Sequence, residues 1–163
     1  MQIDIVNEQN EIIGVLERSK VLAQGKNFRT VHAWLFRPNG RLVLQELAPT
    51  HSRNPNLLGS SVAGYLHAGE TYRHAIERKS LQEVGVIPRN LEEIGSAAMS
   101  DESSTKFVSL YIGYLDDEPK TEDLSIERFI ALDFEDIDRR FKQSPESFTP
   151  TFGFLYREFR DSI

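Results

Sequence analysis

The 163-residue sequence contains no cysteine. Disulfides, thiolate metal ligands and cysteine nucleophiles are therefore excluded. Long apolar runs are also missing, since none approaches the ~18 residues that a helix needs to span a bilayer. The segment 1–6 is acidic and alternating, and it lacks the positive region and the long apolar core of a signal peptide. We therefore expect a soluble cytoplasmic protein that does not bind a membrane.

Basic residues are outnumbered: 19 Lys and Arg stand against 25 Asp and Glu, which gives a formal net charge of -6. This balance argues against binding to a nucleic acid polymer, which requires a basic surface. A small local basic patch could still hold the phosphate of a small ligand. The length favours one domain that is large enough to bury a core, so we expect a single domain over 1–163.

Apolar patterning and turn formers alternate along the chain in a regular way. They predict an opening hairpin around a turn at 7–10, a short helix at 19–24, strands at 28–37, 42–47, 61–66, 91–98, 107–115 and 126–132, helices at 71–84, 134–141 and 149–160, and loops at 48–59 and 100–105. This order indicates an α/β (α+β) fold with a mixed β-sheet sandwiched between helices. We expect an N-terminal hairpin extension at 1–27, a core at 28–143 and a C-terminal helix at 144–163.

The stretch 64–86 is the most informative part of the chain. It reads as a glycine loop that leads into a helix, and the helix ends at Gly85, with Pro88 beyond it. It resembles the Nudix phosphohydrolase signature, Gx5Ex7REUxEExGU with U aliphatic. The positions that match are Gly64, Glu70, Arg78, Glu83, Gly85 and Val86, and those that differ are Lys79, Ser80 and Gln82. The strings 31–45, 61–70 and 127–137 are similar to the branch related to isopentenyl diphosphate isomerase, whose N-terminal extension the opening hairpin resembles.

The resemblance implies a fold and a chemistry. Nudix enzymes hydrolyse diphosphates with divalent metal, which neutralises the phosphate oxygens and activates water. In the family three glutamates stand at positions 79, 82 and 83. The spacing i, i+3, i+4 puts all three on one helical face. The resemblance therefore implies magnesium (Mg2+) or manganese (Mn2+) as cofactor.

The family pattern also assigns roles to individual residues. The metal ligands it implies here are the carbonyl of Gly64 and the side chains of Glu70, Gln82 and Glu83. The catalytic residues it implies are Glu83, Arg78, which would orient the glutamates, and Glu102, which would assist the attacking water from the loop 100–105.

Lys79 and Gln82 depart from the family pattern and remove roughly three negative charges from the metal site, and an ammonium group can fill the place of a metal ion. Two functions stay open. One is a metal-dependent pyrophosphohydrolase for a nucleoside diphosphate linked to another group. The other is an inactive module that binds a phosphorylated ligand. The isomerase reaction uses a cysteine in the family, so we set it aside. In a third view, Lys79 and Glu83 form a plain surface salt bridge and Glu70 caps the helix.

Several further side chains are weaker candidates, and a homodimer stays open. These candidates are Asp101 as a second loop carboxylate, His67 and His74 as metal ligands beside Glu70, Trp34, Phe36, Tyr111 and Tyr114 for stacking on a base, and Arg37, Arg41 and Arg53 for contacts to phosphate.

Overall fold

The computed structural model describes residues 1–101 and 103–163. Its strands are β1 (Gln2–Val6), β2 (Ile12–Glu17), β3 (Phe28–Phe36), β4 (Leu42–Leu47), β5 (Leu58–Gly59), β6 (Val62–Tyr65), β7 (Arg89–Ser100), β8 (Thr105–Tyr114) and β9 (Ile126–Leu132). Its α-helices are α1 (Arg18–Ala23), α2 (Tyr72–Val84), α3 (Phe134–Gln143) and α4 (Pro150–Phe159), and short 3-10 turns follow at Pro145–Ser147 and Arg160–Ser162. No helix in the described part of the chain is long and apolar enough to cross a membrane.

Seven strands form one mixed sheet in the order β5-β4-β3-β8-β7, with β6 paired to β3 and β9 paired to β4. The β3–β8 pair is parallel, and the other pairs are antiparallel. The sheet forks at β3. This strand pairs with β4 only at Leu35 and Phe36, and from Thr30 to Ala33 it pairs with β6 instead. The fork separates β6 from β4, and the side chains described below lie beside it.

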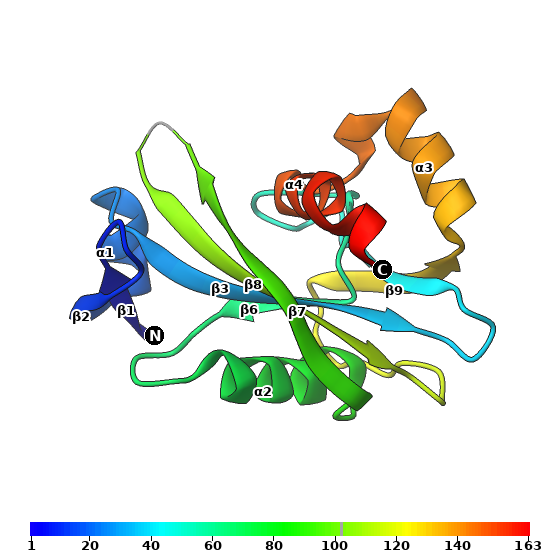
Figure 1. Ribbon diagram of the computed structural model, residues 1–163, viewed down its shortest axis with the longest axis horizontal. Helices are drawn as coiled ribbons and strands as arrows, with labels where there is room; N and C mark the ends of the chain where they lie inside the picture. The colour runs from blue at the N-terminus through cyan, green and yellow to red at the C-terminus, as the bar shows by residue number, and fades with distance from the viewer. Residues whose placement is uncertain (102) are drawn as a thin grey trace.

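Helices cover both faces of the sheet, with α2 on one face and α3 and α4 on the other (Figure 1). Side chains alternate along β3, because successive residues of a strand point to opposite faces. Val31 and Ala33 pack with α2, whereas Trp34 packs with Phe152 of α4. The predicted fold, a mixed sheet sandwiched between helices, is confirmed.

The N-terminal hairpin β1–β2 forms a separate two-stranded sheet, as predicted. Its core residue Ile3 clusters with Val21 of α1 and Phe28 of β3. The hairpin also contacts the loop before α2, because the amide of Ala68 donates to the Gln2 carbonyl and the amide of Gly69 donates to Asp4. The division of the chain at 1–27, 28–143 and 144–163 stays a prediction.

Two local differences from the sequence prediction have clear causes. The strands β7 and β8 run further toward each other than predicted, up to the pair Ser100 and Thr105, whose hydroxyls lie 2.8 Å apart. The residues at 100–105 are polar, so they show no alternation of apolar side chains, and the sequence therefore predicted a loop. The short strand β5 lies inside the predicted loop 48–59, because Leu58 and Gly59 pair with β4. Two residues are too few to show a period.

Both ends of α2 follow from its sequence. The cap is Thr71 and not Glu70, since the Thr71 hydroxyl accepts from the amide of His74 at 3.1 Å, whereas the Glu70 carboxylate accepts from Arg78 and the His67 amide. At the other end Gly85 adopts a φ of 85° and donates its amide to the Ser80 carbonyl. A Cβ on Gly85 would lie 2.8 Å from the carbonyl oxygen of Lys120, so the loop before β9 packs directly on this glycine.

We therefore predict that Gly85→Ala destabilises the protein more than Gly40→Ala does. Both glycines have a positive φ, but a Cβ on Gly40 would meet nothing within 4 Å. The control variant thus carries only the backbone cost of roughly 1–2 kcal/mol, and Gly85→Ala adds overpacking of about 1–3 kcal/mol. Urea unfolding measures both, and equal losses would contradict the proposed close contact with Lys120.

Candidate functional site

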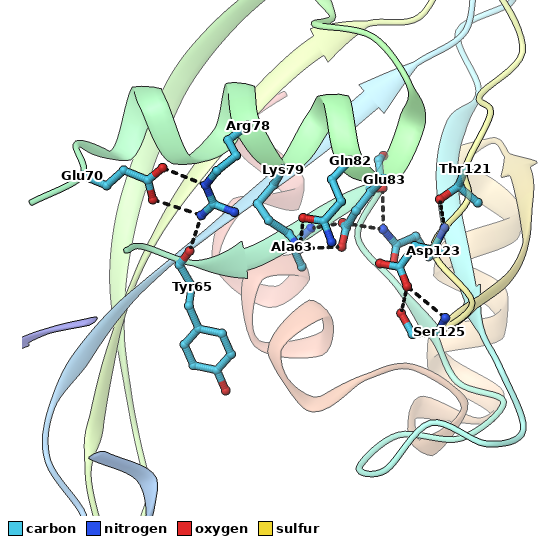
Figure 2. A network of polar contacts seen from close by, with 12 residues as sticks. Ala63, Tyr65, Glu70, Arg78, Lys79, Gln82, Glu83, Thr121, Asp123 and Ser125 are labelled. Carbon is cyan, nitrogen blue, oxygen red and sulfur yellow. Dashed lines mark hydrogen bonds and ion pairs between the residues drawn. The ribbon is translucent and has the colours of Figure 1, made fainter. Parts of the chain in front are cut away.

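Glu70 and Arg78 form a bidentate ion pair at the start of α2 (Figure 2). The Arg78 Nε lies 2.7 Å from Glu70 Oε2 and its Nη2 lies 3.0 Å from Oε1, which also accepts from the His67 amide. Burial alone would raise the pKa of Glu70, but the hydrogen bonds from Arg78 and His67 outweigh it and lower the pKa. Arg78 also donates to the carbonyl of Tyr65, so it ties the glycine loop to the helix.

Glu83 is held by three donors on the inner side of α2. Its Oε1 accepts from Gln45 Nε2 at 2.8 Å and from the Ala63 amide at 2.9 Å, and its Oε2 lies 3.2 Å from Lys79 Nζ. Burial raises the pKa of Glu83, and the Lys79 ammonium is the strongest influence in the other direction. The predicted salt bridge between Lys79 and Glu83 forms, but it is not exposed: the two side chains are 14% and 8% exposed, so Glu83 is buried and Lys79 is mostly shielded from water.

Lys79 lies directly over Gly64. A Cβ on Gly64 would approach the Lys79 Cε, Cδ and Cγ atoms to 2.5, 2.6 and 2.7 Å, so only glycine leaves room for this lysine stem. The ammonium group also donates to Gln82 Oε1 at 3.2 Å (Figure 2). Lys79 therefore engages both Gln82 and Glu83, two of the residues that the resemblance assigned to the metal.

These contacts do not fit the carboxylate-rich metal site that the resemblance implies. Residues 1–101 and 103–163 contain no group of three or more His, Asp or Glu side chains that could hold a metal ion. Glu70 forms a salt bridge with Arg78, and Glu83 forms one with Lys79. The ligand roles of Gly64 and the three side chains stay predictions, and so do the catalytic roles. Glu102 lies outside the described residues.

A cavity of about 340 Å³ lies beside the fork of the sheet, and Gly64 and Glu83 of the signature line it. Gln45 of β4, His32 of β3 and Glu83 of α2 line this cavity together. The other residues that line it are Arg18, Leu22, Thr30, Leu47, His51, Ser52, Arg53, Asn54, Gly59, Ser60, Ala63, Tyr65, Lys106, Ser125, Thr149 and Thr151. A cavity of about 420 Å³ is lined by Arg37 and Arg41 and by none of the signature residues, and a cavity of about 800 Å³ is lined by Gln82 and Gly85.

Asp123 is a neighbour of the site that the sequence analysis missed. Its Oδ1 accepts from the amide and the hydroxyl of Ser125, at 2.9 and 2.6 Å. Burial would raise the pKa of Asp123, but these hydrogen bonds and the Lys79 charge lower it. Figure 2 shows it close to the end of α2 that carries Gln82 and Glu83. The only sequence signal is the Asp-x-Ser turn pattern, which is common in loops.

The structure places the weaker candidate residues in different environments. Trp34 is fully buried and donates to Ser60 Oγ, so its ring is part of the core. His74 is exposed and joins no metal-binding group in the described part of the chain. Arg37 pairs with Glu118 away from the signature, whereas Arg53 lines the cavity at the fork.

Known proteins resemble this chain in both sequence and structure. Residues 26–152 match the family model for the NUDIX domain. A "Nudix hydrolase" of Deinococcus radiodurans is 34% identical over 85 residues, which is 52% of this chain and half the length of that relative. An isopentenyl-diphosphate Delta-isomerase of Serratia proteamaculans is 25% identical over 153 residues, which is 91% of this chain and 85% of that protein. The crystal structure of DR0079 from Deinococcus radiodurans covers 97% of this chain and 98% of its own, with a TM-score of 0.84 and 26% identity.

The chain therefore belongs to the NUDIX domain family, as predicted, and its relatives include both a Nudix hydrolase and an isopentenyl-diphosphate Delta-isomerase. The family assignment does not change the finding that the contacts of Lys79 and Glu83 do not fit a carboxylate-rich metal site. Lys79 still lies where the family places a carboxylate.

We predict that Lys79→Met destabilises the protein by about 3–5 kcal/mol, because it leaves the buried Glu83 carboxylate without its counter-charge. The double variant Lys79→Met with Glu83→Gln should recover a large part of this loss, since the amide oxygen still accepts from Ala63 and Gln45. Urea unfolding of the single and double variants measures the difference. If the second substitution recovered nothing, the charge would not be the cause.

A further prediction concerns His32, which lines the cavity and is buried with its Nδ1 2.8 Å from Ser60 Oγ. Burial, assisted by the charge of Lys106, lowers the pKa of His32 from 6.5 to about 3. The unfolded chain thus binds one more proton than the folded chain between these values, and stability falls as pH falls through this window, by at most about 1.4 kcal/mol per pH unit. His32→Gln should lose less stability than the wild type between neutral and mildly acidic pH in urea unfolding, and parallel losses would refute this.

Proposed function

We propose that this protein binds a small phosphorylated compound in the cavity at the fork of the sheet, and that the Lys79 ammonium acts in the place where the family uses a metal ion. The observation that supports this most directly is the position of Lys79 Nζ, 3.2 Å from both Glu83 Oε2 and Gln82 Oε1. An ammonium group held there is a fixed positive charge beside a cavity that Glu83 and Gly64 line.

The physical basis is the charge of the ligand. A phosphate needs positive charge and hydrogen-bond donors, and lysine supplies both without a metal. Glu83 would then position the ammonium rather than bind an ion. Because Glu83 is itself fixed by Gln45 and Ala63, the lysine is anchored to the sheet through two rigid contacts. Such support from a second layer of residues is what keeps a binding group in place.

A second candidate function is metal-dependent hydrolysis of a diphosphate linkage, in a nucleoside diphosphate linked to another group or a related compound. The NUDIX family match and the hydrolase relative support it. Mg2+ or Mn2+ would supply Lewis-acid chemistry, with Glu70, Gln82, Glu83 and the Gly64 carbonyl as ligands, while Arg78 orients Glu70 and Glu102 assists the water. This function requires Lys79 to leave Glu83, which costs a buried ion pair.

One pair of experiments separates the two functions. We expect inorganic pyrophosphate to bind the purified protein in the presence of a chelator, as measured by calorimetry, and Lys79→Met to weaken this binding by about tenfold or more. A panel of nucleoside diphosphate derivatives should show no turnover with added magnesium or manganese. Binding that depends on metal, together with turnover that Glu83→Gln abolishes, would establish the hydrolase and refute the module.

We also predict that Lys79→Glu with Gln82→Glu restores a metal site. The two changes return the helix face to the three carboxylates of the family pattern, at the spacing that hard cations bind. Calorimetric titration with manganese should then show binding that is absent from the wild type. The matched control is Lys79→Gln, which removes the lysine but adds no carboxylate. Equal manganese binding by the control and the double variant would contradict the role given to the carboxylates.

A further inference from the structure

Lys106 of β8 is a cation without a counter-ion in the described structure. Its side chain lines the cavity and is partly buried, and its Nζ donates to the Thr151 hydroxyl at 2.6 Å. Within residues 1–101 and 103–163, no carboxylate lies within 4.0 Å of it. Burial and the nearby charge of Arg53 lower the pKa of Lys106, and Asp101 counteracts them only in part. A charge that is desolvated without a counter-charge is unfavourable for folding.

Two arginines join Lys106 at the same cavity, from other parts of the chain. Arg53 comes from the loop between β4 and β5, and its Nη1 donates to the Tyr65 hydroxyl at 3.3 Å. Arg18 begins α1, and its guanidinium lies 5.1 Å from the centre of the Tyr65 ring. Neither arginine makes an ion pair with any carboxylate that the structure describes. Three segments thus bring positive charge to one cavity. Among the described residues that line it, Glu83 is the one carboxylate, and it is already paired with Lys79.

The shape of this region favours an oxyanion over a flat base. At about 340 Å³ the cavity is near the lower end of the roughly 300–1,000 Å³ that is typical of ligand sites. Tyr65 is the only Phe, Tyr or Trp side chain in its described lining, and the ring already stacks on Phe28 with centroids 5.4 Å apart. Besides the cations, the described lining offers hydroxyls such as those of Thr149 and Thr151, carboxamides, histidines and the leucines Leu22 and Leu47.

The register of the strands separates this region from the Lys79 site. Ala63, whose amide binds Glu83, is opposite His32, whereas Lys106 is opposite Phe28. These two levels are four residues apart along β3, which corresponds to about 13 Å at ~3.3 Å per residue. The backbones that carry the two groups are therefore separate, and Lys79 is not among the residues that line the cavity, whereas Lys106, Arg53 and Arg18 are.

We infer that Lys106, Arg53 and Arg18 form a second phosphate subsite, which holds a phosphate group of the ligand in the part of the cavity that these three cations line. The inference rests on the proposed function for its biological setting, and it narrows the ligand class: a compound that also reaches Lys79 carries two phosphate-bearing groups separated by a spacer. A phosphate dianion supplies the counter-charge that Lys106 and Arg53 lack in the described structure. Arginine adds its planar set of donors, which matches phosphate oxygens.

The test uses inorganic phosphate as the probe and full-length protein. We expect phosphate binding, measured by calorimetry, to weaken by about tenfold in Lys106→Met and in Arg53→Gln. Arg41→Gln is the matched control, since it removes one exposed positive charge outside this cavity and should change the affinity less than twofold. Without phosphate, Lys106→Met should unfold at the same temperature as the wild type or at a higher one, because the substitution removes a desolvated charge. A purely structural lysine would show the opposite change.

Each other result has a defined meaning. If the wild type does not bind phosphate, or if Arg41→Gln weakens binding as much as Lys106→Met does, the second subsite is refuted. If Lys79→Met abolishes phosphate binding while Lys106→Met does not, the probe binds at the Lys79 site, so the proposed function stands and the second subsite is refuted. If Lys106→Met abolishes phosphate binding while Lys79→Met has no effect on phosphate or pyrophosphate, the subsite stands and the role of Lys79 is refuted.

Discussion

The buried ion pair between Lys79 and Glu83 is the interaction on which the candidate site depends. Two charges with little access to water must satisfy each other, because an unpaired one would cost several kcal/mol. Gln45 and the Ala63 amide complete the hydrogen bonding of Glu83, so the helix α2 is joined to both branches of the forked sheet. A family member with a glutamate at position 79 would hold like charges here and would need a cation from solution. This chain supplies the cation itself.

The fold makes this substitution possible through space as well as charge. Gly64 leaves room for the stem of Lys79, and the fork between β6 and β4 lets Gln45 reach Glu83. On the same side of the molecule, the cavity collects positive side chains from α1, the loop after β4 and β8. An acidic protein with a net charge of -6 thus contains a locally basic cavity. A net charge describes the whole surface, so it does not prevent a local site from holding a phosphate.

Much of the fold followed from local patterns. The helix α2 and its stop at Gly85 follow from residues within one or two turns of each other, and apolar segments bounded by turn formers identified β3 and β4. The extra pairs at Ser100 and Thr105 and the short strand at Leu58 could not be predicted, since their pairing depends on a partner strand rather than on their own periodicity. The same limit applies to Asp123, whose loop is placed near the site by the contact between Lys120 and Gly85.

By itself, the sequence determined the family, the mixed sheet with helices on both faces, and the presence of Lys79 and Gln82 where the signature it resembles has glutamates, because spacing and residue type are local properties. Only the tertiary structure decided what replaced them. It showed that the Lys79–Glu83 pair is buried rather than exposed, and that Lys106, Arg53 and Arg18 share one cavity. Burial and long-range proximity arise when distant segments pack together. These two quantities set how strongly a charged group interacts with its neighbours.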